Sequence, residues 1–500
     1  MRVLRFAQMS FLLALHWPAM AGDQATIVDH PSKLVYPELE FTPPERDKYR
    51  HVLPCGVVVY VVEDHDLPLI DLSVTVRTGR YLEPKGKEGL SELAGSQMRA
   101  GGTAKSSPDD FDEEVAFLAA NLNSSIGDTE GSASFNCLTP DLDRVLELFF
   151  DMLRTPRFDS SRLDLRKSQQ LQDLARRNDQ TPSIENREWE RLLRGPDFFS
   201  VDRVTKASIE GIQHDDLVAF HRRYFRPKNF IVAVSGDAST QKILEKLEAK
   251  LAPWAKDDAL ADPVPPVPKP SHQLKPGLYL VDKPSVNQGR VSIGHVSTTR
   301  DNPDYHALYI MNHILGGGGF TSRITSRVRS DKGLAYTAGS RFEFGVYYDG
   351  IFRALFQSKS ESVAEATAIV LEEISKLRSE KVSKDELETA VNYAIGVFPR
   401  FFATAQAIAS TLASDEFSGR DPAFWRTYRQ KMKAVTEEDV LRVAKKYLHP
   451  EQWIILAVGN AAEILKGNAS TPERSLEKLA GPAGIRRIPL PDPLTLEYGT

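Results

Sequence analysis

Two stretches of the chain, 212–237 and 435–460, follow the same sequence pattern. Three positions match at an offset of 223 residues: Tyr224 with Tyr447, Pro227 with Pro450, and Gly236 with Gly459 (447 − 224, 450 − 227, 459 − 236). In both stretches a helical pattern, a proline turn, a β-branched strand and a Gly-Asp or Gly-Asn turn follow in the same order. This self-similarity predicts two copies of one domain. Any chemistry can then be sought in each copy.

Length and composition agree with a multidomain globular protein. The chain has 500 residues, of which 41% are hydrophobic, so it is long enough for two or three domains with sizeable cores. Its formal net charge is only −5. A charge this small gives no electrostatic reason to expect a nucleic acid or an anionic membrane surface as a partner.

The N-terminus has the pattern of an export signal. Arg2 and Arg5 precede the apolar run FLLAL at 11–15, and Ala-Met-Ala at 19–21 fits a small-x-small cleavage site. We expect a signal peptide over residues 1–21 and a protein that is periplasmic or secreted. The alternative is a buried N-terminal helix. No apolar run approaches the ~20 residues that a membrane span needs.

Proline-rich sequence divides the two copies. The run PVPPVPKP at 263–270 favours an extended linker, because proline donates no backbone hydrogen bond. We therefore predict the following arrangement: a first domain at 22–255, a linker at 256–277, a second domain at 278–480, and a proline-rich tail at 481–500 outside any core.

Each copy has strands next to strands and helices next to helices. VVVYVV at 57–62 predicts a buried strand, and Ile70, Leu72, Val74 and Val76 alternate with polar residues, as in a half-buried strand. Strands that follow one another closely favour antiparallel pairing. The sequence thus predicts an α+β fold of two homologous domains, each a mainly antiparallel sheet covered by helices.

The two cysteines, Cys55 and Cys137, leave a choice open. An exported protein can form a disulfide between them, or both can remain free thiols. The Cα separation that decides between these possibilities is not encoded in the sequence.

A glycine run leads into an unusual pair of side chains. Residues 316–336 read GGGGFTSRITSRVRSDKGLAY and contain Gly316, Gly317, Gly318, Gly319, Arg329 and Tyr336. The run lacks both the Gly-Lys-Ser/Thr of a phosphate loop and the Gly-x-Gly-x-x-Gly spacing. Read by itself, the segment is a turn with a surface arginine and a packed tyrosine. A guanidinium can also hold a carbonyl or carboxylate, and a phenol can donate to a developing oxyanion.

This segment resembles a motif of the insulinase/pitrilysin-type zinc peptidases, a family that includes mitochondrial processing peptidase and bacterial two-domain members. The resemblance extends over about residues 45–465, with further matches at 53–79, 89–103 and 200–237. In this family such an Arg and Tyr lie in the second domain and hold substrate backbone opposite the zinc. The resemblance therefore implies substrate-binding roles for Arg329, Tyr336 and the glycines at 316–319.

The zinc motif of that family is missing. Active members carry H-x-x-E-H on the first helix of the first domain, where two histidines one turn apart share the metal and the glutamate activates water. Aligned on the match at 89–103, the three positions fall on Glu92, Gly95 and Ser96. We expect no metal in this chain. The other candidate ligands are interpreted as structural or surface residues: the charged loop at 63–66 and His214, His221, His295, His306 and His313.

A retained substrate pair beside a lost metal site predicts a non-catalytic, substrate-binding subunit. A homologous partner carrying H-x-x-E-H would supply zinc and the general base, and the substrate would be a peptide or an unfolded protein segment. The alternative is a stand-alone peptide-binding or scaffold protein of the same fold. A hydrolase with Ser96 as nucleophile is a third hypothesis, for which no base can be named.

Overall fold

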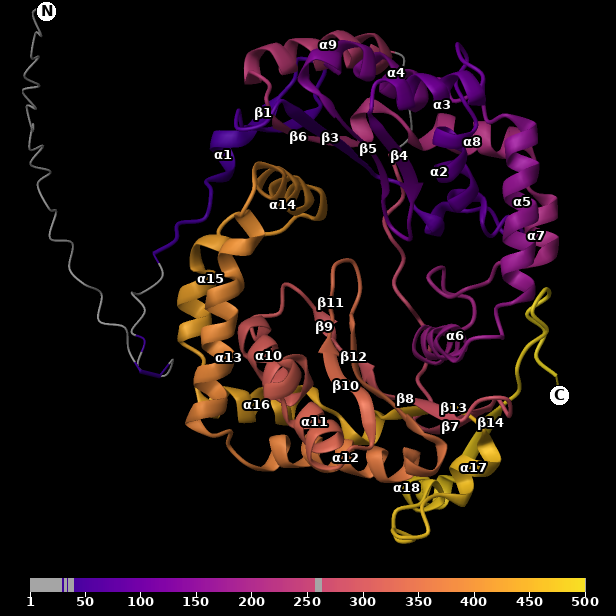
Figure 1. Cartoon of the computed structure of the whole chain (residues 1–500), viewed down its shortest axis with the longest axis vertical. Helices are drawn as coiled ribbons and strands as arrows, with labels where there is room; N and C mark the ends of the chain where they lie inside the picture. The colour runs from indigo at the N-terminus through magenta and orange to yellow at the C-terminus, as the bar shows by residue number, and fades with distance from the viewer. Residues whose placement is uncertain (1–28, 31–33, 35–39, 257–262, 500) are drawn as a thin grey trace, which may run out of the picture. The chain divides into compact units, whose positions relative to one another are not determined.

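The computed structural model of the chain describes residues 29–30, 34, 40–256 and 263–499 (Figure 1). The predicted signal peptide, 1–21, lies outside the described residues. The chain divides after Phe41 into two units, and the second unit contains every helix and strand of the described residues. Within those residues no helix is both long enough and apolar enough to cross a membrane.

Two six-stranded sheets organise the second unit. The first sheet contains β1 (Arg50–Val52), β2 (Val58–Glu63), β3 (Leu69–Val76), β4 (Asn121–Ile126), β5 (Gly131–Leu138) and β6 (Phe230–Gly236). The second contains β7 (Gly277–Asp282), β8 (Gln288–Val296), β10 (Ala335–Phe342), β12 (Ile351–Lys359), β13 (Ile454–Gly459) and β14 (Ile485–Ile488). A separate short parallel pair is formed by β9 (Thr298–Thr299) and β11 (Phe344–Gly345).

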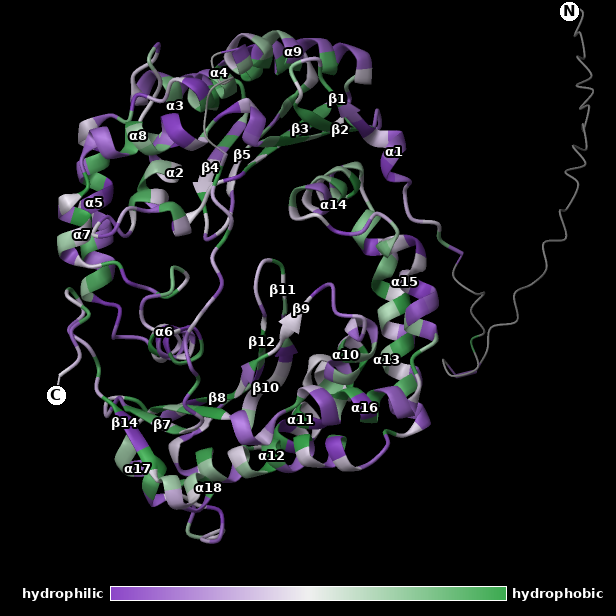
Figure 2. Cartoon of the chain, turned by 180° about the vertical axis from the view of Figure 1, so that it is seen from behind, coloured by the Kyte–Doolittle hydropathy of each residue, from purple (hydrophilic) through white to green (hydrophobic). Residues whose placement is uncertain are grey.

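Helices follow the strands in both halves. The first half has α1 (Arg46–Tyr49), α2 (Leu90–Ala100), α3 (Pro108–Phe117), α4 (Leu142–Arg154), α5 (Ser160–Ala175), α6 (Thr181–Arg194), α7 (Lys206–Gly211), α8 (His214–Tyr224) and α9 (Thr240–Lys256). The second half has α10 (Tyr305–Asn312), α11 (Arg323–Thr325), α12 (Val363–Ser379), α13 (Lys384–Val397), α14 (Ala405–Ser418), α15 (Phe424–Lys433), α16 (Glu437–Tyr447), α17 (Ala461–Lys466) and α18 (Leu476–Ala480). Figure 2 shows hydrophobic and hydrophilic residues together on helices such as α9 and α13, as expected when one face of a helix packs on a core.

The two sheets share one strand order. It is β1-β2-β6-β3-β5-β4 in the first sheet and, read from the other end, β14-β7-β13-β8-β12-β10 in the second. The pairs β2/β6 and β7/β13 are parallel, and the next three pairs in each sheet are antiparallel. Only the outermost strand differs, because β1 is antiparallel to β2 while β14 is parallel to β7. The predicted α+β fold with mainly antiparallel sheets is confirmed.

Each half supplies one helix to the sheet of the other half. The helix α6 packs against β8 and β13 of the second sheet, and α14 packs against β2 and β6 of the first. Their starts are 224 residues apart (405 − 181), so the two helices are equivalent in the repeat. Ile184, Trp189 and Leu193 of α6 are buried in the same cluster as strand residues of the second sheet. The apolar faces of α6 and α14 therefore join the halves.

A buried carboxylate fixes α6 on the second sheet. Glu185 is 0% exposed. It accepts hydrogen bonds from the Ser292 hydroxyl and from Arg290 Nε (2.6 Å), and it pairs with Arg353 at 3.0 Å. A buried charge is tolerated when it is paired and hydrogen-bonded in this way. Because a displaced α6 would leave these charges buried and unpaired, the network specifies its position.

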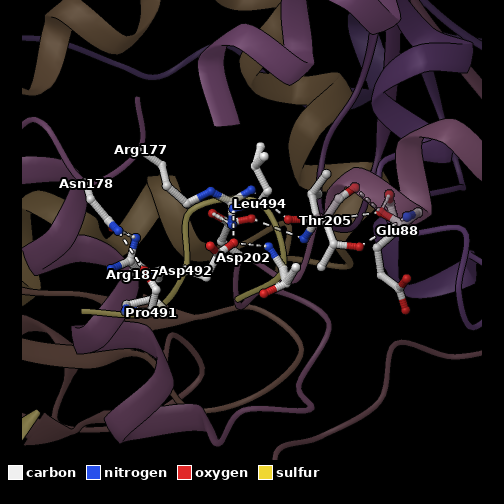
Figure 3. A network of polar contacts seen from close by, with 12 residues as sticks. Glu88, Arg177, Asn178, Arg187, Asp202, Thr205, Pro491, Asp492 and Leu494 are labelled. Carbon is white, nitrogen blue, oxygen red and sulfur yellow. Dashed lines mark hydrogen bonds and ion pairs between the residues drawn. The ribbon is translucent and has the colours of Figure 1, made fainter. Parts of the chain in front are cut away.

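The proline-rich tail is part of the fold. The strand β14 pairs with β7, and Ile488 is buried in the cluster that contains α6. Beyond it, Asn178 Nδ2 donates to the Pro491 carbonyl and the Lys206 N–H donates to the Leu494 carbonyl, both at 2.8 Å (Figure 3). The expectation that the tail lies outside any core is wrong. The outer edge of β7 needs backbone partners, and β14 provides them.

Candidate functional site

A cavity of about 570 Å³ lies along β10. Among the described residues β10 pairs only with β12, so its other edge is free of strand partners. The cavity is bordered by η5 (His313–Gly317) and η7 (Ser326–Asp331), which are both π-helical. Such wide turns are rare and occur often at functional sites. The cavity thus combines an open strand edge with unusual helix geometry.

The glycine run forms one wall of this cavity. Gly316, Gly317 and Gly319 are lining residues, whereas Gly318 is not. A Cβ at Gly316 would lie 2.4 Å from Ser340 N of β10, so only glycine lets η5 approach the strand this closely. Gly319 has φ +60°, in the left-handed region that favours glycine. These two glycines are therefore required by the backbone, and their side of the cavity stays open.

Arg329 and Tyr336 meet at the mouth of the cavity. Arg329 Cζ lies 4.5 Å from the centroid of the Tyr336 ring and 4.5 Å from that of Phe320. Among the described residues, no hydrogen-bond acceptor or carboxylate contacts the Arg329 guanidinium. Tyr336 is 81% exposed. The two rings orient the guanidinium, and its N–H donors remain available to a ligand.

A second aromatic pair lines the cavity beside the glycines. The His313 ring stacks on Tyr393 with centroids 4.4 Å apart. Burial lowers the pKa of His313, so its ring is neutral at pH 7. Asn312 accepts a hydrogen bond from the Ser340 hydroxyl at 2.7 Å and connects the helix to β10. This wall is aromatic and uncharged.

Sequence reasoning missed Phe320, His313 and Tyr393 as cavity residues. Phe320 directly follows the glycine run. Its ring is 65% exposed in the folded chain, and the sequence does not reveal that exposure. His313 was interpreted as structural. It is buried, but it also lines the cavity. Tyr393 comes from α13, a distant element, and no local pattern connects it to the glycine run.

The three positions aligned with the zinc motif all lie on α2. Glu92 accepts hydrogen bonds from Arg166 at 2.9 Å and Gln170 at 2.8 Å, both on α5. A Cβ at Gly95 would lie 2.5 Å from the backbone N of Ile126 on β4. The hydroxyl of Ser96 donates to the carbonyl of the residue three positions earlier at 3.2 Å. These three positions therefore supply no imidazole, and the one carboxylate among them is hydrogen-bonded to α5.

Gly95 and Gly316 occupy equivalent places in the two halves. Each lets a helix approach the outermost antiparallel strand of its sheet, β4 or β10, and the two glycines are 221 residues apart (316 − 95). The cavity of the second half is therefore the repeat counterpart of the degenerate zinc region. The helix meets the strand closely at both glycines, and Gly316 in addition lines the cavity.

The remaining candidate ligands are dispersed. Within residues 29–30, 34, 40–256 and 263–499, no group of three or more His, Cys, Asp or Glu side chains could hold a metal ion. Burial lowers the pKa values of His221, His295 and His306 to about 4, which keeps these rings neutral. Cys55 and Cys137 are both free thiols, and burial raises the pKa of Cys137 to about 12.

Family models match both halves of the chain. Residues 58–192 match the model described as insulinase (peptidase family M16), and residues 211–393 match the model described as peptidase M16 inactive domain. The chain is 24% identical over 357 residues to the non-peptidase homolog YmxG of Helicobacter pylori, covering 70% of this chain and 80% of that protein. It is 19% identical over 429 residues to a probable mitochondrial-processing peptidase subunit beta of Arabidopsis thaliana, covering 81% and 77%.

Solved structures share the fold. A peptidase M16 inactive domain from Pseudomonas fluorescens superposes with a TM-score of 0.73 at 23% identity, covering 82% of this chain and 97% of that one. The periplasmic protease PqqL of Escherichia coli gives a TM-score of 0.68 at 17% identity, covering 82% of this chain and 45% of that one. At such low identities, these likenesses establish the architecture alone.

Proposed function

The chain belongs to the insulinase family of peptidases, peptidase family M16, and from that premise we propose that it is the non-catalytic, substrate-binding subunit of a heterodimeric zinc peptidase. The similarity to a protein named a non-peptidase homolog supports an inactive member of the family. The geometry at Glu92, Gly95 and Ser96 agrees with this, because these residues bond to α5, abut β4 or bond within α2. The peptidase activity would reside in a homologous subunit that carries H-x-x-E-H.

The single observation that carries this proposal is the unpaired guanidinium of Arg329 beside Tyr336 in an open cavity. A guanidinium held against two rings loses little entropy when it binds a carbonyl or carboxylate of the substrate. The Tyr336 phenol can donate a hydrogen bond to an oxygen that gains charge during amide hydrolysis. The partner's zinc would supply the activated water. The glycines at 316–319 would leave room for the peptide backbone.

Substrates of this site would be extended. The outer edge of β10 has no strand partner among the described residues, so an extended peptide would add there as a strand, away from the Ala338 and Ser340 carbonyls that already accept from Thr325 and Asn312. This mode depends on main-chain bonds and accepts many sequences. The proposed substrate class is accordingly peptides or unfolded protein segments.

The proposed location is outside the cytoplasm. It depends on the signal-like pattern of residues 1–21, with Arg2 and Arg5 before an apolar run. The E. coli structural neighbour is named a periplasmic protease, which is compatible with this location. N-terminal sequencing of the protein from the periplasmic fraction tests it, and a retained residue 1 there would contradict cleavage.

The decisive experiment is reconstitution. Cleavage of a quenched fluorescent peptide is measured for this chain alone, for the H-x-x-E-H subunit alone, and for both together. We expect zinc-dependent cleavage only by the pair, and a loss of about 10²–10³-fold in kcat for Arg329→Ala or Tyr336→Phe. The exposed Arg487, outside the cavity, gives the matched control Arg487→Ala. Cleavage by this chain alone, or pair activity that ignores both substitutions, contradicts the proposal.

One observation favours the alternative of a stand-alone binding protein. The helix α6 packs on the sheet of the second half, and α14 packs on the sheet of the first half. Residues 42–500 of a single chain therefore form one compact unit. A scaffold protein would show no change in function after Tyr336→Phe. The Ser96 nucleophile hypothesis has no such support, because the described residues bring no histidine or aspartate to its hydroxyl.

A further inference from the structure

The cavity along β10 has a strong imbalance of charge. Its lining includes two arginines, Arg329 and Arg341, and no aspartate or glutamate. Arg341 is exposed on β10, and its guanidinium has no acidic partner among the described residues. By contrast, the nearby Arg323 of α11 is neutralised, because it forms two hydrogen bonds with Glu386, at 2.6 and 2.9 Å. The cavity lining therefore carries two positive charges that have no acidic partner among the described residues.

The same cavity is apolar around these charges. The Arg329 guanidinium lies over the rings of Phe320 and Tyr336, and the Tyr393–His313 stack lies on another part of the lining. Contacts with aromatic rings use the plane of a guanidinium and leave its N–H edges for hydrogen bonds. Those edges form a planar fork that matches a carboxylate in two parallel hydrogen bonds.

We propose that this cavity selects peptide segments in which a carboxylate stands next to an apolar or aromatic side chain. The proposal rests on the proposed function and narrows its substrate class. A backbone carbonyl satisfies hydrogen bonds but carries no net charge, so it leaves both guanidiniums uncompensated. A carboxylate supplies negative charge to a cavity whose lining carries Arg329 and Arg341, and an adjacent apolar side chain can pack on the aromatic lining. The carboxylate can belong to Asp, Glu or a free C-terminus.

Binding of matched peptides to the full purified chain tests the proposal without a partner. The probes are fluorescently labelled hexapeptides with the core Ala-Ala-Phe-Glu-Ala-Ala and an amidated end, the same peptide with Gln in place of Glu, and the Gln peptide with a free C-terminal carboxylate. Fluorescence anisotropy gives each Kd for the wild type, Arg341→Gln and Arg487→Gln. Arg487 is exposed on β14 and outside the cavity, so its substitution removes the same charge elsewhere.

We expect the amidated Glu peptide to bind about tenfold more tightly than the amidated Gln peptide, because a charge-assisted hydrogen bond replaces a neutral one. Arg341→Gln should remove most of this preference and Arg487→Gln should retain it. High salt should weaken the Glu peptide more than the Gln peptide, because exposed charges are screened. If only the free C-terminus restores affinity to the Gln peptide, and Glu adds nothing, the carboxylate source is the chain end.

Two results would overturn the inference, and they differ in what else they affect. If all the peptides bind alike and Arg341→Gln changes nothing, charge selection is wrong while the peptide-binding role stands. If none of the peptides binds to the wild-type chain, although that chain unfolds cooperatively, and the reconstituted pair also fails to cleave them, both the inference and the proposed function are wrong.

Discussion

Arg323 and Arg329 show how the same residue type takes opposite roles six positions apart (329 − 323). Arg323 is fixed by a bidentate pair with Glu386, with its nearer contact at 2.6 Å, and serves the packing of α11 on α13. Among the described residues, the guanidinium of Arg329 has ring contacts and no hydrogen-bond partner. A guanidinium that is already paired with a carboxylate has few N–H donors left for a ligand. An unpaired guanidinium in a cavity can donate its N–H groups to a ligand. The difference between them comes from the neighbouring elements.

Restoring the zinc motif should fail. In a Glu92→His, Gly95→Glu, Ser96→His variant, the new side chain at 95 has its Cβ 2.5 Å from Ile126 N. Overpacking of this kind costs about 1–3 kcal/mol, and the helix must move away from β4. We expect a lower urea midpoint and no stoichiometric zinc by atomic absorption. Ser96→His alone is the control, because Ser96 is only partly buried. A fully folded triple variant with one bound zinc would contradict this expectation.

His306 should make the protein less stable in mild acid. Burial lowers its pKa to about 4, and its Nε2 has no partner among the described residues. The unfolded chain takes up a proton near pH ~6.5 and the folded chain only near 4, so the stabilising contribution is full above pH ~6.5 and is lost as the pH falls toward 4. His306→Phe suits the surrounding aromatic rings and should reduce the drop in urea midpoint between pH 7 and pH 5.

An equal drop for His306→Phe and the wild type would show that other groups control the acid response.

At the scale of elements, the fold depends on segments that reach across the molecule. The helix α6 covers the second sheet, α14 covers the first, and β14 completes the second sheet from the end of the chain. The tail continues along α6, where the Tyr498 hydroxyl donates to Glu188 at 2.8 Å and Arg191 lies 4.1 Å over its ring. Each of these contacts joins residues that are far apart in sequence.

Removal of the tail should therefore destabilise the protein. Truncation after residue 480 deletes β14 and exposes the edge of β7. The burial of Ile488 alone contributes about 1.5–3 kcal/mol, and the Tyr498 hydrogen bond about 1 kcal/mol more. We expect a lower urea midpoint and increased binding of a hydrophobic dye. Deletion of only the residues after Tyr498 is the control. An unchanged midpoint for the long truncation would show that the tail is dispensable.

At the scale of the whole molecule, the duplication is nearly symmetric in its backbone and asymmetric in its chemistry. Both halves use a glycine to bring a helix against an outer strand, and in the second half that glycine, Gly316, also lines a cavity. In the first half, Glu92 of α2 accepts hydrogen bonds from Arg166 and Gln170 of α5. The proposed binding site therefore lies in the second copy.

The halves should fold poorly apart. A fragment of residues 42–255 lacks α14, so Tyr60, Ile231 and Ala233 of the first sheet would face water. We expect this fragment to aggregate or to elute as large species in size-exclusion chromatography. Co-expression with residues 263–500 should restore a soluble complex, because each piece then contributes its exchanged helix. A monomeric 42–255 fragment with cooperative unfolding would instead support independent domains.

Local patterns revealed much of the fold. The alternation in β3 and the Pro-turn-strand repeat around Pro227 and Pro450 are short-range features, so they predicted strands, helices and the duplication correctly. The predicted domain limits stay a prediction. The helix α6 lies within 22–255 in the sequence but packs on the sheet of the second half. The tail was wrongly placed outside the core, because proline content says nothing about the unpaired edge of a remote strand.

The sequence by itself determined that the chain is a duplicated α+β protein, that Arg329 and Tyr336 stand near a glycine run, and that the three zinc-motif positions hold other residues. Only the tertiary structure decided which arginine lacks a partner, which rings surround it, and which helix covers which sheet. The physical reason is range. Periodicity and turns come from bonds between neighbours in sequence, whereas an unpaired charge or a shared core depends on residues that only folding brings together.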